Sequence, residues 1–232
     1  MLKVELHAHT DMDPADRIPH STRELIDRAS SLGYDALAVT LHDRYFEPAE
    51  WADYARRRGI ILLSGIERTI GRQHVLLINF PASCESAGSF DEIARLKAAS
   101  GGLVIAPHPF FPTPSALRSE MDRQESVIDA VEFNALFTRH VDFNRRAVKW
   151  ARAHAKPLVG NSDVHLLDQL GRTYSLVDAR PSADAICSAI RAGRVELRSQ
   201  ALSLREAASI FGRMLMTGVQ GRVTSPYQVE RT

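Results

Sequence analysis

The apolar positions of this chain fall into short runs that alternate with amphipathic stretches. Several runs are rich in Val, Ile and Leu at nearly every residue, as expected for strands that are covered on both faces. The pattern predicts strands over residues 3–9, 35–42, 60–67, 74–80, 102–109, 129–135, 157–165 and 174–179.

Helical patterns follow most of these predicted strands. The first begins at Ser21, carries Glu24 three residues later and stops at Gly33, which indicates a capping box and a C-terminal glycine. Comparable amphipathic patterns cover residues 48–59, 89–102, 142–156 and 181–194. Because strand and helix alternate, the sequence predicts a parallel α/β sheet, either closed as a barrel or open and doubly wound.

The alternation continues without a linker or repeat to about residue 200. A last helix is expected over residues 202–216, with its stripe of Leu, Ile, Phe and Met packed on the body. We therefore predict one domain over residues 1–217 and a polar, mobile C-terminal tail over residues 218–232.

Composition narrows the classes of function. The 232 residues include 29 basic and 28 acidic side chains, so the net charge of +1 creates no overall field for nucleic acid or a membrane, although local basic patches remain open. No signal-like segment precedes Val4, and no apolar run approaches the roughly 18 residues of a membrane span, so we expect a soluble, cytoplasmic protein. Cys84 and Cys187 are interpreted as buried thiols of a reducing compartment, with a single disulfide as the alternative.

Histidines and carboxylates gather where the predicted strands end. The ends of five strands carry such side chains: His7 with His9, His42, Glu67, His108, and Asp163 with His165. Residues two apart on a strand point to the same side, so the two side chains of each pair can bind one ion together. The carboxyl edge of parallel strands is where α/β active sites are built. Each residue alone has an ordinary structural explanation, but packing gives no reason for all of them to share one edge, where crowded polar groups lose solvation.

Bound cations would offset this loss of solvation. Imidazole nitrogens and carboxylate oxygens without thiolates suit Zn²⁺, Mn²⁺ or Fe²⁺. The candidate ligands outnumber the coordination positions of one ion. We therefore expect two or three divalent ions, two of them bridged by Glu67. Such centres hydrolyse phosphate esters, and we predict that a metal-bridging hydroxide near Glu67 and Asp163 attacks phosphorus. His108 is the third predicted catalytic residue.

Five segments resemble, in order and spacing, the motifs of the PHP family (polymerase and histidinol phosphatase domains). They read "HAHT" (7–10), "VTLHD" (39–43), "SGIE" (64–67), "APHP" (106–109) and "NSDVH" (161–165). The resemblance covers residues 3 to about 195. It implies a distorted, TIM-like (β/α)₇ barrel with a trinuclear metal centre at the C-terminal mouth of the strands, and hydrolysis of phosphate monoesters or diesters.

The resemblance also implies the ligands of each ion. They are His7, His9, Glu67 and Asp163 for the first metal, His108 and His140 for the second, and His42 and His165 for the third. A further ligand is expected after "HAHT"; His20 is favoured over Asp16 and Asp13, although His20 can also be explained as a residue preceding the helix cap. Leu41 stands where the family has an aspartate that orients ligands, which could weaken the third site.

Substrate contacts are expected from residues near these ligands. Arg172 is the first candidate to bind the substrate phosphate, followed by Arg44 and Arg139, because guanidinium groups match phosphate oxygens. His74 could reach the mouth as a ligand or a substrate contact, against the alternative of a hydrogen-bonded residue at the edge.

The favoured function is hydrolysis of a small phosphorylated substrate by a phosphomonoesterase, such as a histidinol-phosphatase-like, nucleotide or sugar phosphatase. The alternative is a 3′–5′ exonuclease or phosphodiesterase that uses the same metals on nucleic acid, with Phe110 and Phe111 stacking on bases. A non-catalytic, metal-stabilised regulatory domain is the third hypothesis. Neither the substrate nor the oligomeric state can be read from the sequence.

Overall fold

The computed structural model describes residues 1–217, so the predicted tail over 218–232 lies outside the described residues. The strands are β1 (Leu2–Glu5), β2 (Ala36–Ala38), β3 (Ile61–Leu63), β4 (Gly65–Ile70), β5 (Gln73–Ile78), β6 (Leu103–Ala106), β7 (Ala130–Asn134), β8 (Leu158–Asn161), β9 (Thr173–Val177) and β10 (Val195–Ser199). The α-helices are α1 (Thr22–Ser31), α2 (Ala52–Arg57), α3 (Phe90–Ser100), α4 (Glu120–Arg123), α5 (Asn144–Ala153), α6 (Ala183–Arg191) and α7 (Leu204–Thr217). Short 3₁₀ turns lie at Pro48–Trp51, Ala82–Ser86 and Leu167–Gln169.

The strands form two mixed sheets of five strands each. The first sheet has the order β10-β9-β1-β2-β3 and the second the order β4-β5-β6-β7-β8. Parallel pairing is confined to β1-β2-β3 and to β6-β7-β8, whereas β9 pairs antiparallel with β1 and β10, and β5 pairs antiparallel with β4 and β6. The α/β class is confirmed, but the prediction of a wholly parallel sheet is wrong.

The hydrogen-bonded strands of residues 1–217 do not close into one barrel. Between β8 and β9 the side chain of Ser175 makes hydrogen bonds where paired strands would have backbone hydrogen bonds. Ser175 Oγ accepts from the amide of Gly160 at 2.8 Å and donates to its carbonyl at 3.3 Å. A Cβ at Gly160 would lie 2.7 Å from the carbonyl oxygen of Tyr174, so only glycine lets these backbones approach. The two sheets therefore meet here through a side chain.

The predicted strand over 60–67 is divided between the two sheets. β3 ends at Leu63 and β4 starts at Gly65, which pairs with β5 instead. A Cβ at Gly65 would stand 2.6 Å from the carbonyl oxygen of Val39, so this crossing needs a glycine. Glu67 consequently lies inside the β4–β5 hairpin and not at a parallel strand end, while an isolated bridge still pairs it with His42.

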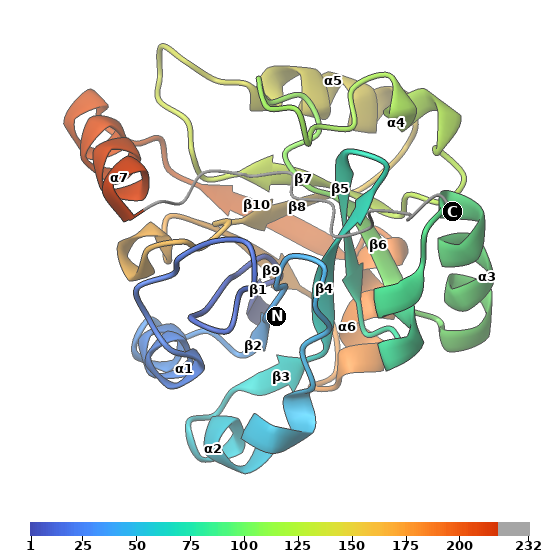
Figure 1. Ribbon diagram of the computed structural model, residues 1–232, viewed down its shortest axis with the longest axis horizontal. Helices are drawn as coiled ribbons and strands as arrows, with labels where there is room; N and C mark the ends of the chain where they lie inside the picture. Colours follow the sequence, from blue (N-terminus) through green and yellow to red (C-terminus); the bar gives the residue numbers. More distant parts are fainter. Residues whose placement is uncertain (218–232) are drawn as a thin grey trace, which may run out of the picture.

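The helices cover the outside of the strands (Figure 1), with α7 standing at the upper left. The predicted capping box of α1 is confirmed, since Ser21 Oγ accepts from the amide of Glu24 while the Glu24 carboxylate accepts from the amide of Ser21. β10 was not predicted, because its residues are exposed or only partly buried and carry no strand-like apolar run.

The interior is an apolar layer shared by both sheets. Val4 of β1, Leu76 of β5, Ile105 of β6 and Val159 of β8 are all fully buried in one cluster, which α6 covers through Ile186 and other residues. Cys84 and Cys187 are free, buried thiols. No helix within residues 1–217 has both the length and the apolar character needed to cross a bilayer.

Candidate metal centre

Glu67 is the centre of a cluster of histidine side chains. Its Oε2 lies 3.3 Å from Nε2 of both His7 and His9 and 3.2 Å from Nε2 of His42. Its Oε1 lies 2.7 Å from Nδ1 of His74 and 3.3 Å from Nε2 of His108. One buried carboxylate thus faces five imidazoles with both oxygens, which is the arrangement that bridging two cations requires.

A short backbone bridge brings the pair His7 and His9 next to the pair Asp163 and His165. Beyond the end of β1, the amide of His9 donates to the carbonyl of Val164 at 3.0 Å, and the amide of Val164 donates to the carbonyl of His7 at 3.1 Å. Side chains on either side of a bridged residue project to one face. Asp163 and His165 therefore lie beside His7 and His9, and Asp163 Oδ1 is 3.3 Å from Nε2 of His7 and 3.5 Å from Nε2 of His9.

Buried acceptors orient most of these imidazoles from behind. Nδ1 of His7 donates to Glu132 at 2.7 Å, and Nδ1 of His9 and of His42 donate to Asp13 at 2.9 and 3.0 Å. Nδ1 of His165 donates to the carbonyl of Asp163 at 3.0 Å. A neutral ring held in this way carries its proton on Nδ1 and directs the lone pair of Nε2 to the centre, as metal-ligating histidines do.

The charges in the cluster are strongly coupled. Burial disfavours the charge of Glu67, yet His74, His7 and His42 hold the pKa of this carboxyl well below its ordinary range. Burial likewise disfavours a charged His7, but Asp163, Glu132 and Glu67 raise its pKa well above the usual value. Glu67 thus stays ionised while His7 favours its protonated form, and a cation entering the site would replace that proton.

The residues fit divalent metal ions. Four groups that contain His7 or His9 each offer ligand atoms within 4.8 Å of one another, namely His7, His108 and Asp163; His7, His9 and Glu67; His9, Asp13 and His42; and His9, Asp163 and His165. Nε2 of His9 is buried without a hydrogen-bond partner, which a coordinate bond would supply. The mixture of imidazole and carboxylate donors suits borderline divalent cations.

Asp16 faces the cluster where His20 was the favoured ligand. Asp16 Oδ2 lies 3.2 Å from Nε2 of His165, and its other oxygen is buried without a partner. Nε2 of His20 instead donates to the backbone carbonyl of His9 at 2.9 Å. Asp13, the third candidate, lies behind the rings of His9 and His42. The geometry therefore favours Asp16 among the three candidates.

His140 and the predicted arginines lie apart from the cluster. His140 and Arg139 are exposed and line a separate cleft of about 510 Å³ together with Arg172. Arg172 pairs with Glu206 of α7, and Arg44 is exposed with its guanidinium on the carbonyl of Met12. The loop after β7 brings Arg139 and His140 to this separate cleft, which spacing along the chain could not reveal. Of the predicted substrate contacts, only His74 reaches the cluster.

Leu41 packs among buried apolar residues that include Ala8, Val39 and Phe46. Its side chain thus contributes to the core, and Asp13 supplies the carboxylate that orients the neighbouring His42. Glu132 was not predicted as a residue of the site. The available signal was its carboxylate, alone among the mostly apolar residues of strand β7.

Two candidate ligands have positive φ angles, which are uncommon for residues other than glycine. His108 has φ of +31° and Asp163 has φ of +51°. Non-glycine residues in the left-handed region cost free energy and persist where the surroundings fix them, often at functional sites. The bond from the amide of His108 to Glu132, 3.1 Å long, is one such constraint.

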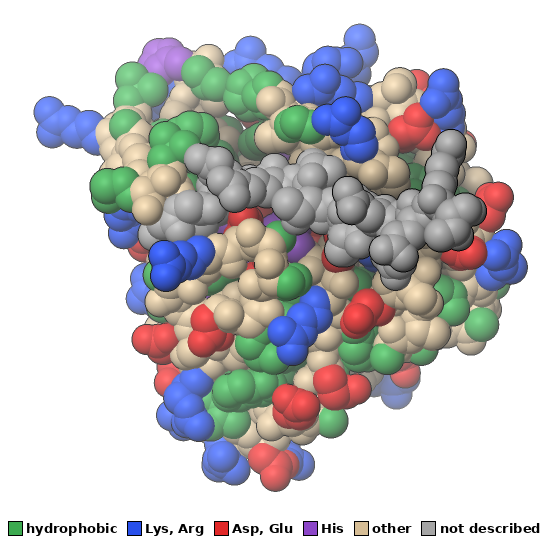
Figure 2. All heavy atoms as spheres, in the orientation of Figure 1, with side chains coloured by type: hydrophobic (Ala, Val, Ile, Leu, Met, Phe, Trp, Pro, Cys, Tyr) green, Lys and Arg blue, Asp and Glu red, His purple; other side chains and the backbone are tan. Residues whose placement is uncertain are grey.

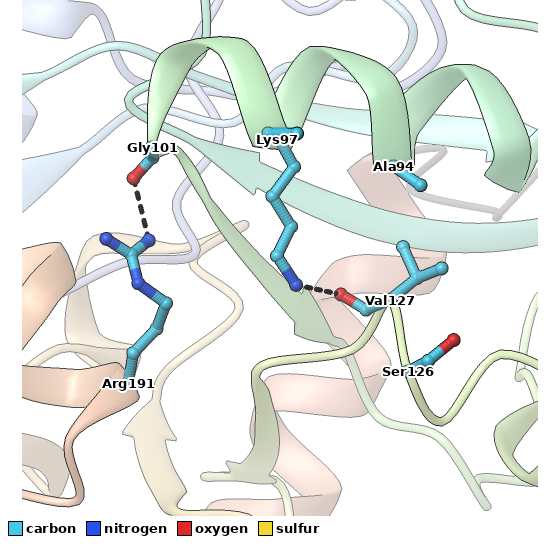
Figure 3. A pocket seen from close by; sticks show the side chains of 7 residues that line it. Ala94, Lys97, Gly101, Ser126, Val127 and Arg191 are labelled. Carbon is cyan, nitrogen blue, oxygen red and sulfur yellow. Dashed lines mark hydrogen bonds between the residues drawn. The ribbon is translucent and has the colours of Figure 1, made fainter.

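A cavity of about 230 Å³ opens over the cluster. Its described lining includes Glu67, His74, His108, Asp163 and His165 together with apolar residues. Another hollow, of about 320 Å³, lies beside α3 (Figure 3). Its two basic side chains are already hydrogen-bonded within the protein, because Lys97 donates to the carbonyl of Val127 and Arg191 donates to that of Gly101. Among the described residues, the candidate metal ligands are therefore gathered around the histidine cavity.

Comparisons with known proteins agree with this geometry. A family model described as PHP-associated (PHP_C) matches residues 142–195. A two-domain protein of Bacteroides vulgatus that contains a predicted PHP-like metal-dependent phosphoesterase superposes with a TM-score of 0.67 at 20% identity, over 86% of this chain and 65% of that one. The chain therefore has a fold similar to that of a PHP-like protein, and its residues 142–195 match the PHP-associated family model.

Two further similar proteins act on DNA according to their names. DNA polymerase III PolC-type of Streptococcus pyogenes is 38% identical over 68 residues, which are 29% of this chain and 5% of the polymerase. A lesion-specific endonuclease of Pyrococcus furiosus superposes with a TM-score of 0.58 at 20% identity, over 90% of this chain and 66% of the endonuclease. The chain thus spans only a small part of the curated polymerases it matches.

Proposed function

We propose that this protein is a metal-dependent phosphomonoesterase that acts on a small phosphorylated substrate. The observation that carries the proposal is the buried Glu67 carboxylate, surrounded by five imidazoles at the floor of a cavity of about 230 Å³. Cavities that enclose drug-sized ligands usually measure roughly 300–1,000 Å³, so this one suits a smaller molecule.

Two or three divalent ions, of Zn, Mn or Fe, would be held by the cluster. His7, His9, Glu67 and Asp163 would hold one; Glu67 and His108 would hold a second; His42, His165 and Asp16 would hold a third. When bound, such ions polarise a phosphoryl oxygen and lower the pKa of coordinated water toward ~7.

The chain's own residues contribute orientation and shielding. No Lys or Arg is among the described residues that line the cavity, so the charge of a phosphate there depends on the cations and on neutral donors. His74 lines the cavity with its Nδ1 fixed on Glu67, which leaves Nε2 to contact the ester. Phe111 and apolar residues of α7 limit access of bulk water.

Hydrolysis of nucleic-acid phosphodiesters is a second candidate. The similar structures include a lesion-specific endonuclease, and the curated matches are DNA polymerases. Four basic side chains of α5, Arg145, Arg146, Lys149 and Arg152, are exposed. Figure 2 shows Lys and Arg gathered along the upper edge, where Figure 1 has α4 and α5. A basic surface of this kind supports contacts with a phosphate backbone.

Reconstitution with metal separates these functions. Chelated protein is reloaded with Mn²⁺ or Zn²⁺, and phosphate release from phenyl phosphate is compared with cleavage of a labelled single-stranded oligonucleotide. We expect phosphate release that falls at least about a hundredfold in Glu67→Gln and in His108→Ala, while exposed Glu196→Gln retains it.

Each contrary result selects another function. Cleavage of the oligonucleotide without release from the monoester would favour the nuclease. Protein that binds metal but hydrolyses neither substrate would favour the metal-stabilised, non-catalytic domain. Activity that survives both the chelator and the Glu67→Gln substitution would reject the proposed centre.

A further inference from the structure

The cavity over the histidine cluster is lined by apolar side chains as well as by candidate ligands. Five apolar residues from three separate segments, here called the apolar wall, line it: Phe111, Leu136, and Phe211, Met214 and Leu215 of α7. Because the candidate ligands and the apolar wall line the same small space, a molecule whose phosphate reaches the cluster must place its remaining part against the apolar wall.

Helix α7 is attached to the rest of the described structure by apolar contacts and ion pairs, while two of its apolar side chains remain more than half exposed. Ile210 is buried against Leu166 and Leu202, and ion pairs of Arg172 with Glu206 and of Arg213 with Asp168 hold the helix in place. Phe211 and Leu215, four residues apart and thus on one helical face, are each 55% exposed. The sequence had predicted that the whole stripe packs on the body. Exposed apolar side chains that adjoin a site commonly mark where a ligand binds.

Several polar groups of the cavity lining are already hydrogen-bonded within the protein. Ser115 Oγ donates to Thr113 Oγ1 at 3.2 Å, and the side-chain amide of Asn134 donates to Glu132 at 2.9 Å and to Asp163 at 3.3 Å. Sugar hydroxyls packed against the apolar wall would lose water without replacing its hydrogen bonds, which is costly. An aromatic ring has no such cost and can pack against Phe111 and Phe211.

We propose that the apolar wall formed by Phe111, Leu136, Phe211, Met214 and Leu215 makes this enzyme select phosphomonoesters whose esterified group is aromatic. The inference rests on the phosphomonoesterase function proposed above, and it assigns the C-terminal helix α7 to substrate specificity. Met214 and Leu136 border the same space, so the aromatic group would be enclosed from several sides.

Binding of phosphonates tests this selectivity without any hydrolysis. Titration calorimetry of the Mn²⁺-loaded protein compares phenylphosphonate with methylphosphonate, which share the phosphate-like head and differ in the apolar group. We expect phenylphosphonate to bind about tenfold more tightly, in keeping with burial of a small apolar group. Phe211→Ala and Leu215→Ala should each lower this preference about threefold to tenfold and leave binding of methylphosphonate unchanged.

Leu204→Ala is the matched control, because Leu204 is an exposed leucine of the same helix that lines the other cleft. Equal affinity for the two phosphonates, or an equal loss of preference in Leu204→Ala, would overturn the inference. Selective binding of phenylphosphonate by a protein that hydrolyses no ester would reject the phosphatase and keep aromatic recognition. Hydrolysis of esters without aromatic selectivity would reject the inference alone.

Discussion

Glu132 accepts a hydrogen bond of 2.7 Å from Nδ1 of His7, and neither side chain is accessible to solvent. Glu132 also accepts from the amide of His108 at 3.1 Å and from the side-chain amides of Asn134 and Asn161 at 2.9 and 3.1 Å. All four partners are donors, so this position requires a group that only accepts. Glu132 thereby fixes the ring of His7 and the backbone of His108, and it couples two candidate ligands to one buried carboxylate.

Replacing Glu132 with Gln should weaken metal binding while leaving the fold intact. The amide NH₂ of Gln would face donors on one side, and the fixed orientation of His7 would be lost. We expect metal affinity to fall about tenfold to a hundredfold, the usual effect of losing a partner that orients a ligand. Calorimetric titration with Zn²⁺ measures this change, with Glu196→Gln at an exposed site as the control. Unchanged affinity would show that His7 needs no such support.

Asp16 and His20 can be distinguished by metal content. Asp16 directs a carboxylate oxygen toward Nε2 of His165 at 3.2 Å, whereas His20 is engaged with the carbonyl of His9. We therefore expect Asp16→Ala to lower the number of bound ions by one, as measured by elemental analysis of the reloaded protein. His20→Gln should retain the full number, since the Gln amide can also donate to a carbonyl. The reverse result would restore His20 as the ligand.

The site was largely predictable because its ligands follow strands whose order along the chain fixes their common edge. His7, His9, His108, Asp163 and His165 needed only the rule that parallel strands present their carboxyl ends together. The capping box at Ser21 was likewise visible, because it depends on residues three apart.

Features that depend on long-range contacts were not predictable. The break at Gly65 arises from its approach to Val39, and the separation of β8 from β9 arises from Ser175; neither contact leaves a local pattern. His140 matched a family interval, but the direction of the loop after β7 decides its position. The exposed face of Phe211 and Leu215 looked like an ordinary packing stripe because an amphipathic pattern does not say what covers it.

Gly65→Ala should destabilise the protein and disturb the centre together. The new Cβ would lie 2.6 Å from the carbonyl oxygen of Val39, and the clash is with backbone that cannot turn aside. We expect a loss of about 1–3 kcal/mol in the free energy of unfolding, typical of overpacking, with weaker metal binding because Glu67 lies two residues away. Urea denaturation measures the loss. Gly88→Ala is the control, since its Cβ would meet only Glu92 at 3.7 Å, and equal stability of the two variants would contradict the argument.

Glu5 should make the stability of the metal-free protein depend on pH. Burial raises the pKa of its carboxyl to about 8, even though its oxygens accept from the amides of Ser162 and His7. The unfolded chain releases this proton near pH 4.5, so between about pH 4.5 and 8 the folded state holds one more proton than the unfolded state. The stabilisation is therefore complete below the unfolded pKa and is lost as pH rises to the folded value.

Glu5→Gln isolates this effect, because the Gln oxygen can still accept from both amides but the side chain does not titrate. The free energy of unfolding of chelated protein, measured in urea at pH 5.5 and 8, should fall more steeply with pH in the wild type, by up to about 1.4 kcal/mol per pH unit. The neighbouring histidines titrate in both proteins, so their contribution cancels in the comparison. Exposed Glu196→Gln should follow the wild type. Parallel curves for Glu5→Gln and the wild type would mean that Glu5 folds as a carboxylate, with the amides of His7 and Ser162 outweighing burial.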